Sequence, residues 1–165
     1  MKNLILKRLI AFIIDYLLIL IYLFLLFGIT IFIGPKPLGP VSGQLLGFIS
    51  VTVPVFLYFF LMENKFGATI GKFFMEISIN PEKGNLFNRN LCKFLPWEVA
   101  HFGIHWIYYF IRLDIQPPVW VWISLIFPQI VVIVYFISIV LTSGKSSVYD
   151  KFAQTEVIRS VDNNS

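Results

Sequence analysis

Glu98, His101 and His105 are the residues whose types and spacing allow chemistry. They lie three and four positions apart, so one face of an α-helix carries all three. A glutamate followed three residues later by a histidine is the spacing of carboxylate-bridged metal sites in helical bundles, and three protein ligands suffice for zinc. Histidine also titrates near neutral pH, which suits a proton relay. The pattern therefore indicates metal binding, proton transfer or polar packing between helices.

Asp15 is the second candidate, because it lies inside an apolar run at residues 9–33. A carboxylate that faces lipid costs about 2.5–3.5 kcal/mol on insertion scales, so Asp15 is expected to face other protein groups. It would either bind an ion or proton, or pack against a basic or hydroxyl partner from elsewhere in the chain. Asp15 and Glu98 are the only acidic residues within the apolar runs. Metal ligands are therefore scarce, which favours polar packing for the glutamate and its two histidines.

The composition identifies the setting in which these residues must work. Of the 165 residues 58% are hydrophobic and 13% are charged, whereas soluble domains usually carry about 25% charged residues. This excludes a soluble or disordered chain. Four apolar runs are long enough to cross a lipid bilayer or nearly so: residues 9–33, 44–62, 95–111 and 119–141. The sequence predicts an all-α membrane protein with four transmembrane helices in one domain, residues 1–165.

The polar residues between and after these runs are expected to form a small cap on one face of the membrane. The cap would comprise residues 63–94 and the tail 142–165. We expect an amphipathic segment on the membrane surface and short strands near 76–79 and 155–161. These two strands could pair.

The basic residues indicate orientation. There are 13 Lys and Arg residues, and with four spans all but Lys36 and Arg112 lie on the side of the two termini. The positive-inside rule then makes both termini cytoplasmic, in a multi-pass protein of the cell membrane. The net charge of +4 is explained by topology, so no nucleic acid partner is expected.

A glycine-rich segment at residues 67–72, with the sequence GATIGK, invites comparison with a phosphate-binding loop. Such a loop needs four residues between its glycines and a Ser or Thr after the lysine. Here three residues intervene and Phe73 follows, so no nucleotide site is expected. The chain also lacks the H-E-x-x-H pattern and a serine-nucleophile motif. We therefore expect neither an enzyme nor a cofactor.

Three short segments, in this order, resemble the RDD family of small bacterial integral membrane proteins: residues 8–15 (RLIAFIID), 67–72 (GATIGK) and 150–155 (DKFAQT). The family is named for one arginine and two aspartates, which correspond here to Arg8, Asp15 and Asp150. Two positions depart from its usual pattern, Ala68 where glutamine is common and Tyr149 where histidine is common. The resemblance implies a membrane location, and sodium–proton exchange is an activity proposed for some members.

Arg8 and Asp150 are expected to meet as a charge pair in the cytoplasmic cap, where a guanidinium can hold a carboxylate in a bidentate contact. The sequence supports two alternative functions. One is a transporter, or transport accessory, for a small cation or protons, with Asp15, Glu98, His101 and His105 as the binding residues. Four helices make a thin pathway, so a transporter would be a homodimer. The alternative is a membrane scaffold or assembly factor with a cytoplasmic partner; a metal-dependent enzyme ranks behind both.

Overall fold

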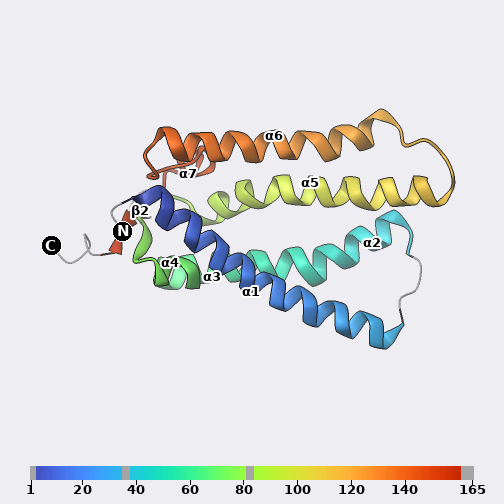
Figure 1. Ribbon diagram of the computed structural model, residues 1–165, viewed down its shortest axis with the longest axis horizontal. Coiled ribbons are helices and arrows are strands. Elements are labelled where there is room, and N and C mark those ends of the chain that lie inside the picture. Colours follow the sequence, from blue (N-terminus) through green and yellow to red (C-terminus); the bar gives the residue numbers. More distant parts are fainter. Residues whose placement is uncertain (1–2, 35–37, 81–83, 161–165) are drawn as a thin grey trace.

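The structure, a computed structural model, describes residues 3–34, 38–80 and 84–160. Within these ranges three helical segments are long and apolar enough to cross a membrane. They are α1 (Leu4–Ile33), the continuous segment formed by α2 (Pro40–Gly47), the π-helical turn η1 (Phe48–Thr52) and α3 (Val53–Phe66), and α6 (Val119–Leu141). A fourth long helix, α5 (Leu86–Arg112), runs beside them (Figure 1).

The first helix begins five residues earlier than the apolar run predicts. Asn3 caps it, since its side-chain oxygen accepts a hydrogen bond from the Ile5 amide at 2.9 Å. Gly34, at a φ of 84°, ends it. The early start places the basic residues Lys7 and Arg8 within the helix, at its N-terminal end.

The second span begins at Pro40, not at residue 44 as predicted. Proline is well suited to the first turn of a helix, because the amide hydrogen that it lacks would have no partner there. The helix changes to π geometry at Phe48–Thr52, just before Pro54. The Tyr22 hydroxyl donates to the Ser50 carbonyl in this turn, which links η1 to α1. Gly67 ends α3 in a left-handed conformation, at a φ of 68°.

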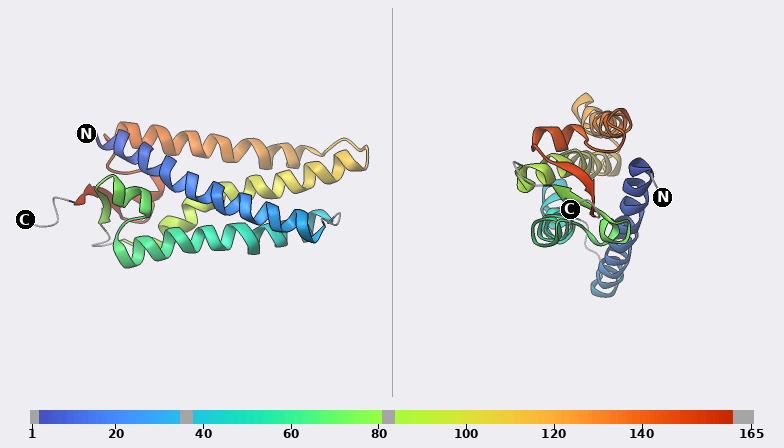
Figure 2. Two further views of the ribbon diagram at one scale, coloured as in Figure 1. Left: turned by 60° about the horizontal axis from the view of Figure 1, so that its bottom comes forward. Right: turned by 90° about the vertical axis from the view of Figure 1, so that its left-hand side faces the viewer.

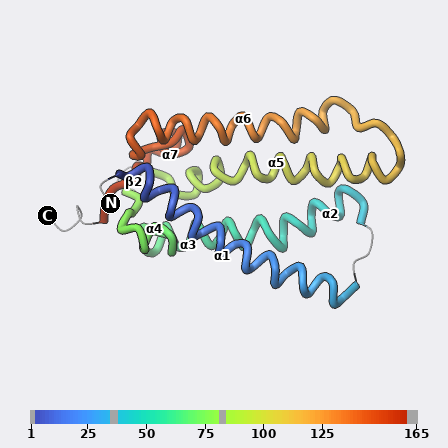
Figure 3. The backbone as a smooth tube through the Cα atoms, viewed as in Figure 1, coloured from blue at the N-terminus to red at the C-terminus, as the bar shows by residue number. Residues whose placement is uncertain are grey.

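Helix α5 starts nine residues before the predicted third run. Asn85 caps it by accepting from the Asn88 amide at 3.0 Å, and the helix continues through Pro96. The segment 63–94 is therefore not a separate surface segment, because its two ends belong to α3 and α5. Helix α5 packs against α6 along one side and against α2 and α3 along the other (Figure 3). At Gly103 the approach to α6 is close, since an added Cβ would lie 2.6 Å from the Ser124 hydroxyl oxygen.

The cap gathers at the end of the bundle where α1 begins and α6 ends (Figure 2). It contains α4 (Ile70–Phe74), β1 (Ile77–Asn80), α7 (Val148–Phe152) and β2 (Glu156–Arg159). The predicted strand pairing is present: β1 and β2 are antiparallel, with Ile77 opposite Arg159 and Asn80 opposite Glu156. Ala11 of α1 packs with Ile77 and Val157, so the sheet rests on the first helix.

Candidate functional site: a buried charge network and a polar helix face

Arg89 is the centre of a charge network inside the cap. It lies in the first turn of α5, where 1% of its side chain is exposed. Its Nη1 donates to Glu63 Oε2 at 2.6 Å, and its Nε donates to Asp150 Oδ1 at 2.7 Å. Both carboxylates are fully buried. One guanidinium therefore joins the end of α3 to α7.

Each of the two carboxylates has further partners. Glu63 accepts from Lys72 Nζ at 2.5 Å and from Asn90 Nδ2 at 2.8 Å. Asp150 accepts from the Ser147 amide at 2.8 Å in the capping box of α7. These contacts extend the network to α4 and give both acids hydrogen-bond donors besides Arg89.

The expected contact between Arg8 and Asp150 is present, but it is not bidentate. Arg8 Nη2 donates to Asp150 Oδ2 at 3.0 Å and to the Tyr149 hydroxyl at 3.1 Å, while Nη1 donates to the Gly144 carbonyl at 2.9 Å. The fork of Arg8 is thus divided among three acceptors. It ties the start of α1 to the segment that follows α6.

The surroundings of the network shift the pKa values of Asp150 and Lys72. Burial by itself raises the pKa of Asp150, but Arg89 and Arg8 outweigh it and hold that pKa below its ordinary value. Burial lowers the pKa of Lys72 to about 8, and the attraction of Glu63 only partly opposes this. Asp150 is thereby held as a carboxylate. Lys72 loses its proton at a lower pH than an ordinary lysine does.

Asp15 lies in a cradle formed by the glycine-rich segment, and 2% of it is exposed. Its Oδ1 accepts from the Tyr58 hydroxyl at 2.7 Å and the Gly71 amide at 2.9 Å, and its Oδ2 accepts from the Thr69 hydroxyl at 2.6 Å. Thr69 is also the N-cap of α4. The segment that resembles a phosphate loop therefore binds a carboxylate of its own chain. Binding of an ion or proton by Asp15 stays a prediction.

Glu98 faces the second span. Its Oε1 accepts from Gln44 of α2, and its Oε2 accepts from Thr52 of η1 at 2.6 Å. The His101 ring lies 4.7 Å from the Trp97 ring and 6.1 Å from the His105 ring, measured between centroids. His105 in turn lines a cavity of about 540 Å³ at the far end of the bundle.

The structure does not bring the candidate zinc ligands together. Across residues 3–34, 38–80 and 84–160, no three His, Cys, Asp or Glu side chains are placed to hold a metal ion jointly. Glu98 is engaged by Gln44 and Thr52, and Asp15 is engaged by the α4 segment. The three residues on α5 instead form a polar face toward the second span, which is compatible with packing or proton transfer.

Glu63, Lys72 and Arg89 are site residues that the sequence interpretation did not identify. In the sequence analysis Glu63 is a polar residue of the cap, Lys72 is part of the glycine-rich segment, and Arg89 is one of the basic residues that indicate orientation. The available signal was that Glu63 is the first charged residue after a long apolar run. A charge in that position lies at the end of a span, where it can be drawn into a cap.

The close contact between α4 and α1 gives a first test. An added Cβ at Gly71 would lie 2.1 Å from the Ala11 carbonyl oxygen, whereas at Gly28 nothing lies within 4 Å. Gly71→Ala should therefore destabilise the protein by more than the 1–3 kcal/mol, roughly, of ordinary overpacking. The matched Gly28→Ala should be neutral, or stabilising by up to about 1 kcal/mol. Thermal unfolding in detergent measures both, and equal effects would contradict the cradle.

The charge network gives a second test. Glu63→Gln removes the negative charge shared by Lys72 and Arg89, so it should cost about 3–5 kcal/mol, as expected for a broken buried pair. Glu76→Gln is the control, because Glu76 pairs with Lys7 but 69% of its side chain is exposed. It should cost at most about 1 kcal/mol. Denaturant unfolding of the two variants compares them, and a similar loss in both would argue against a network that stabilises the cap.

A match to one protein family covers most of the chain. The RDD family model matches residues 3–154, which include α1, the second span, α5, α6 and the residues of the charge network. Searches of curated proteins and of solved structures found no match. RDD proteins are membrane proteins, in keeping with the apolar helices described above. The chain belongs to the RDD family.

Proposed function

We propose that this RDD protein crosses the membrane four times and moves protons or a small cation along the face of α5 that meets the second span. Both termini would lie in the cytoplasm of a cell whose membrane holds the protein. We propose no enzymatic activity for this protein. The observation that carries the proposal is the position of Glu98, an acidic side chain near the middle of a long helix, which accepts hydrogen bonds from the neutral side chains of Gln44 and Thr52.

The fourth span is α5. Its 27 residues correspond to a length of about 40 Å, enough for a hydrocarbon core of about 30 Å. Its low apolarity arises from residues that contact the second span or the cap, namely Arg89, Glu98 and His105. Residues elsewhere on its surface are apolar and exposed, as a lipid-facing surface requires: Leu91, Leu95, Phe102, Ile104 and Ile111.

Cysteine labelling distinguishes four spans from three. Two single-cysteine variants in a Cys92→Ser background are compared: Gln116→Cys, which lies between α5 and α6, and a cysteine added after Ser165. Four spans place residue 116 outside and the C-terminus inside. Three spans without α5 place them the opposite way round, so labelling of intact cells with a membrane-impermeant maleimide decides the question.

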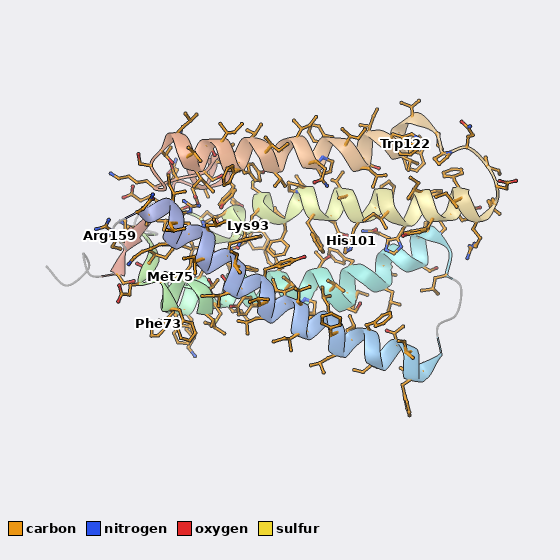
Figure 4. All side chains as sticks on the ribbon, in the orientation of Figure 1. Phe73, Met75, Lys93, His101, Trp122 and Arg159 are labelled. Carbon is orange, nitrogen blue, oxygen red and sulfur yellow. The ribbon has the colours of Figure 1, made fainter. Side chains whose placement is uncertain are left out.

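The polar path has members on both sides of Glu98. Toward the cap lies Lys93, whose Nζ is 3.3 Å from the centroid of the Phe59 ring, and then the charge network. Away from the cap lie His101 and His105, and then the cavity. Figure 4 shows Lys93 and His101 at separate levels of the same helix (Figure 4). Glu98, His101 and His105 lie at successive turns of one helix face, and such polar groups support transfer along it.

The flux experiment uses purified protein in liposomes with imposed proton, sodium or potassium gradients. Glu98→Gln keeps the size of the side chain and its ability to bond Thr52, but it cannot carry a proton. We expect the flux to fall by at least about tenfold, equivalent to about 1.4 kcal/mol of barrier. Thermal stability should change by only about 0.6 kcal/mol, typical of a polar contact between membrane helices.

The matched control is Glu156→Gln, which removes an exposed carboxylate from β2. Its flux should equal that of wild type. Absence of any flux in wild type would contradict transport. Equal flux in wild type and Glu98→Gln would remove Glu98 from the path.

A scaffold is the second candidate, favoured by exposed aromatic side chains on the cap. Phe73 and Phe74 of α4 are 76% and 69% exposed, and Phe152 of α7 is 70% exposed. Phe73 points away from the bundle (Figure 4). A cytoplasmic partner would cover such residues.

A transporter would in addition be a homodimer, because four helices alone enclose little space.

A further inference from the structure

The cavity at the far end of the bundle has the features of a ligand site. It lies between α2 and α5, and its volume is about 540 Å³. Its polar lining residues are Ser50, His105, Tyr108, Tyr109 and Arg112. Cavities of 300–1,000 Å³ with apolar walls and a few convergent polar groups are typical of sites for small molecules.

Two glycines bring the walls of this cavity together. An added Cβ at Gly43 would lie 2.9 Å from His105 Nδ1, and one at Gly47 would lie 3.6 Å from Nε2. The imidazole therefore rests directly on the backbone of α2. This close approach fixes the floor of the cavity and leaves the last turn of α5 as its rim.

The rim carries three side chains that can donate hydrogen bonds. The side chains of Tyr108, Tyr109 and Arg112 have no hydrogen-bond or ion-pair partner among the residues that the structure describes. The described residues that line the cavity include no Asp or Glu. A guanidinium and two hydroxyls without a nearby carboxylate complement an anion rich in acceptors, such as a phosphate.

The remaining walls are apolar. Leu38, Pro40, Leu46 and Ile111 complete the lining, and 55% of Leu46 and 60% of Ile111 are exposed. Because Pro40 is the first residue of the second span, the cavity lies where a membrane-crossing helix begins. The polar end of a ligand there would contact Arg112 and the tyrosine hydroxyls, and its apolar part would contact the apolar side chains of the lining.

We propose that this cavity binds one anionic phospholipid, with its phosphate on Arg112 and the two tyrosine hydroxyls and its acyl chains over Leu46 and Ile111. The charge of Arg112 selects the headgroup, and the apolar wall selects a lipid over a free phosphate. This site goes beyond the proposed function and does not require that the chain transports anything. A lipid bound here would hold the ends of α2 and α5 together.

The test is native mass spectrometry of delipidated protein titrated with dioctanoyl phosphatidylglycerol. Wild type should bind one lipid in a saturable step. Arg112→Gln should weaken binding by about tenfold or more, the scale of one hydrogen bond to a charged group. Tyr108→Phe should weaken it by a smaller factor. Arg112 and Tyr108 are both exposed, so these variants should fold. Lys151→Gln removes one exposed cation from the cap and should bind as wild type does.

Two further ligands separate the sources of affinity. Glycerol 3-phosphate carries the anion without acyl chains, and dioctanoylglycerol carries the chains without the anion. Both should bind at least about tenfold more weakly than the intact lipid. Equal binding of glycerol 3-phosphate would make this a site for soluble phosphates. Equal binding of dioctanoylglycerol, or an Arg112→Gln variant that binds like wild type, would overturn recognition of an anionic headgroup.

Discussion

The arrangement of the cap depends on one buried cation, Arg89. Its side chain bonds Glu63 at one nitrogen and Asp150 at another, so α3, α5 and α7 meet at a single guanidinium. Dehydrating three charges costs several kcal/mol for each ion, and only good geometry with further hydrogen bonds offsets that cost. Here Lys72, Asn90 and the Ser147 amide supply those bonds. Loss of one member leaves its buried partners with fewer opposite charges, which makes the arrangement of the cap specific.

Asp15 attaches the first helix to this assembly by a different means. Its partners are a tyrosine hydroxyl, a threonine hydroxyl and a backbone amide, none of them cationic. The amide belongs to Gly71, where the backbones of α4 and α1 approach too closely for a side chain. Lys72 follows directly and joins the network at Glu63. Neighbouring residues of α4 thus connect two buried acids, Asp15 and Glu63. The glycine-rich motif is explained by packing.

The sequence predicts the long helices because apolar runs must cross a bilayer, and it predicts the strand pair from two short alternating segments. It places the helix starts poorly, since Asn3, Pro40 and Asn85 begin helices among residues that look like loops. The contact of Arg8 with Asp150 follows from the family resemblance. The link from Arg89 to Glu63 could not be predicted, because it joins residues 26 positions apart whose pairing depends on how α3 and α5 pack. The contact of Asp15 with α4 and its N-cap likewise depends on tertiary structure.

The contrast between the acids indicates where a proton could move. Glu63 and Asp150 each face at least two cations, so protonating either one breaks ion pairs that stabilise the cap. Among the residues that the structure describes, Glu98 bonds the Gln44 amide and the Thr52 hydroxyl and forms no ion pair. Its partner Thr52 belongs to a π-helical turn, a geometry often found at functional sites. The ion pairs of the cap therefore join the ends of the helices, whereas the neutral hydrogen-bond partners of Glu98 support the transfer along α5 that we propose.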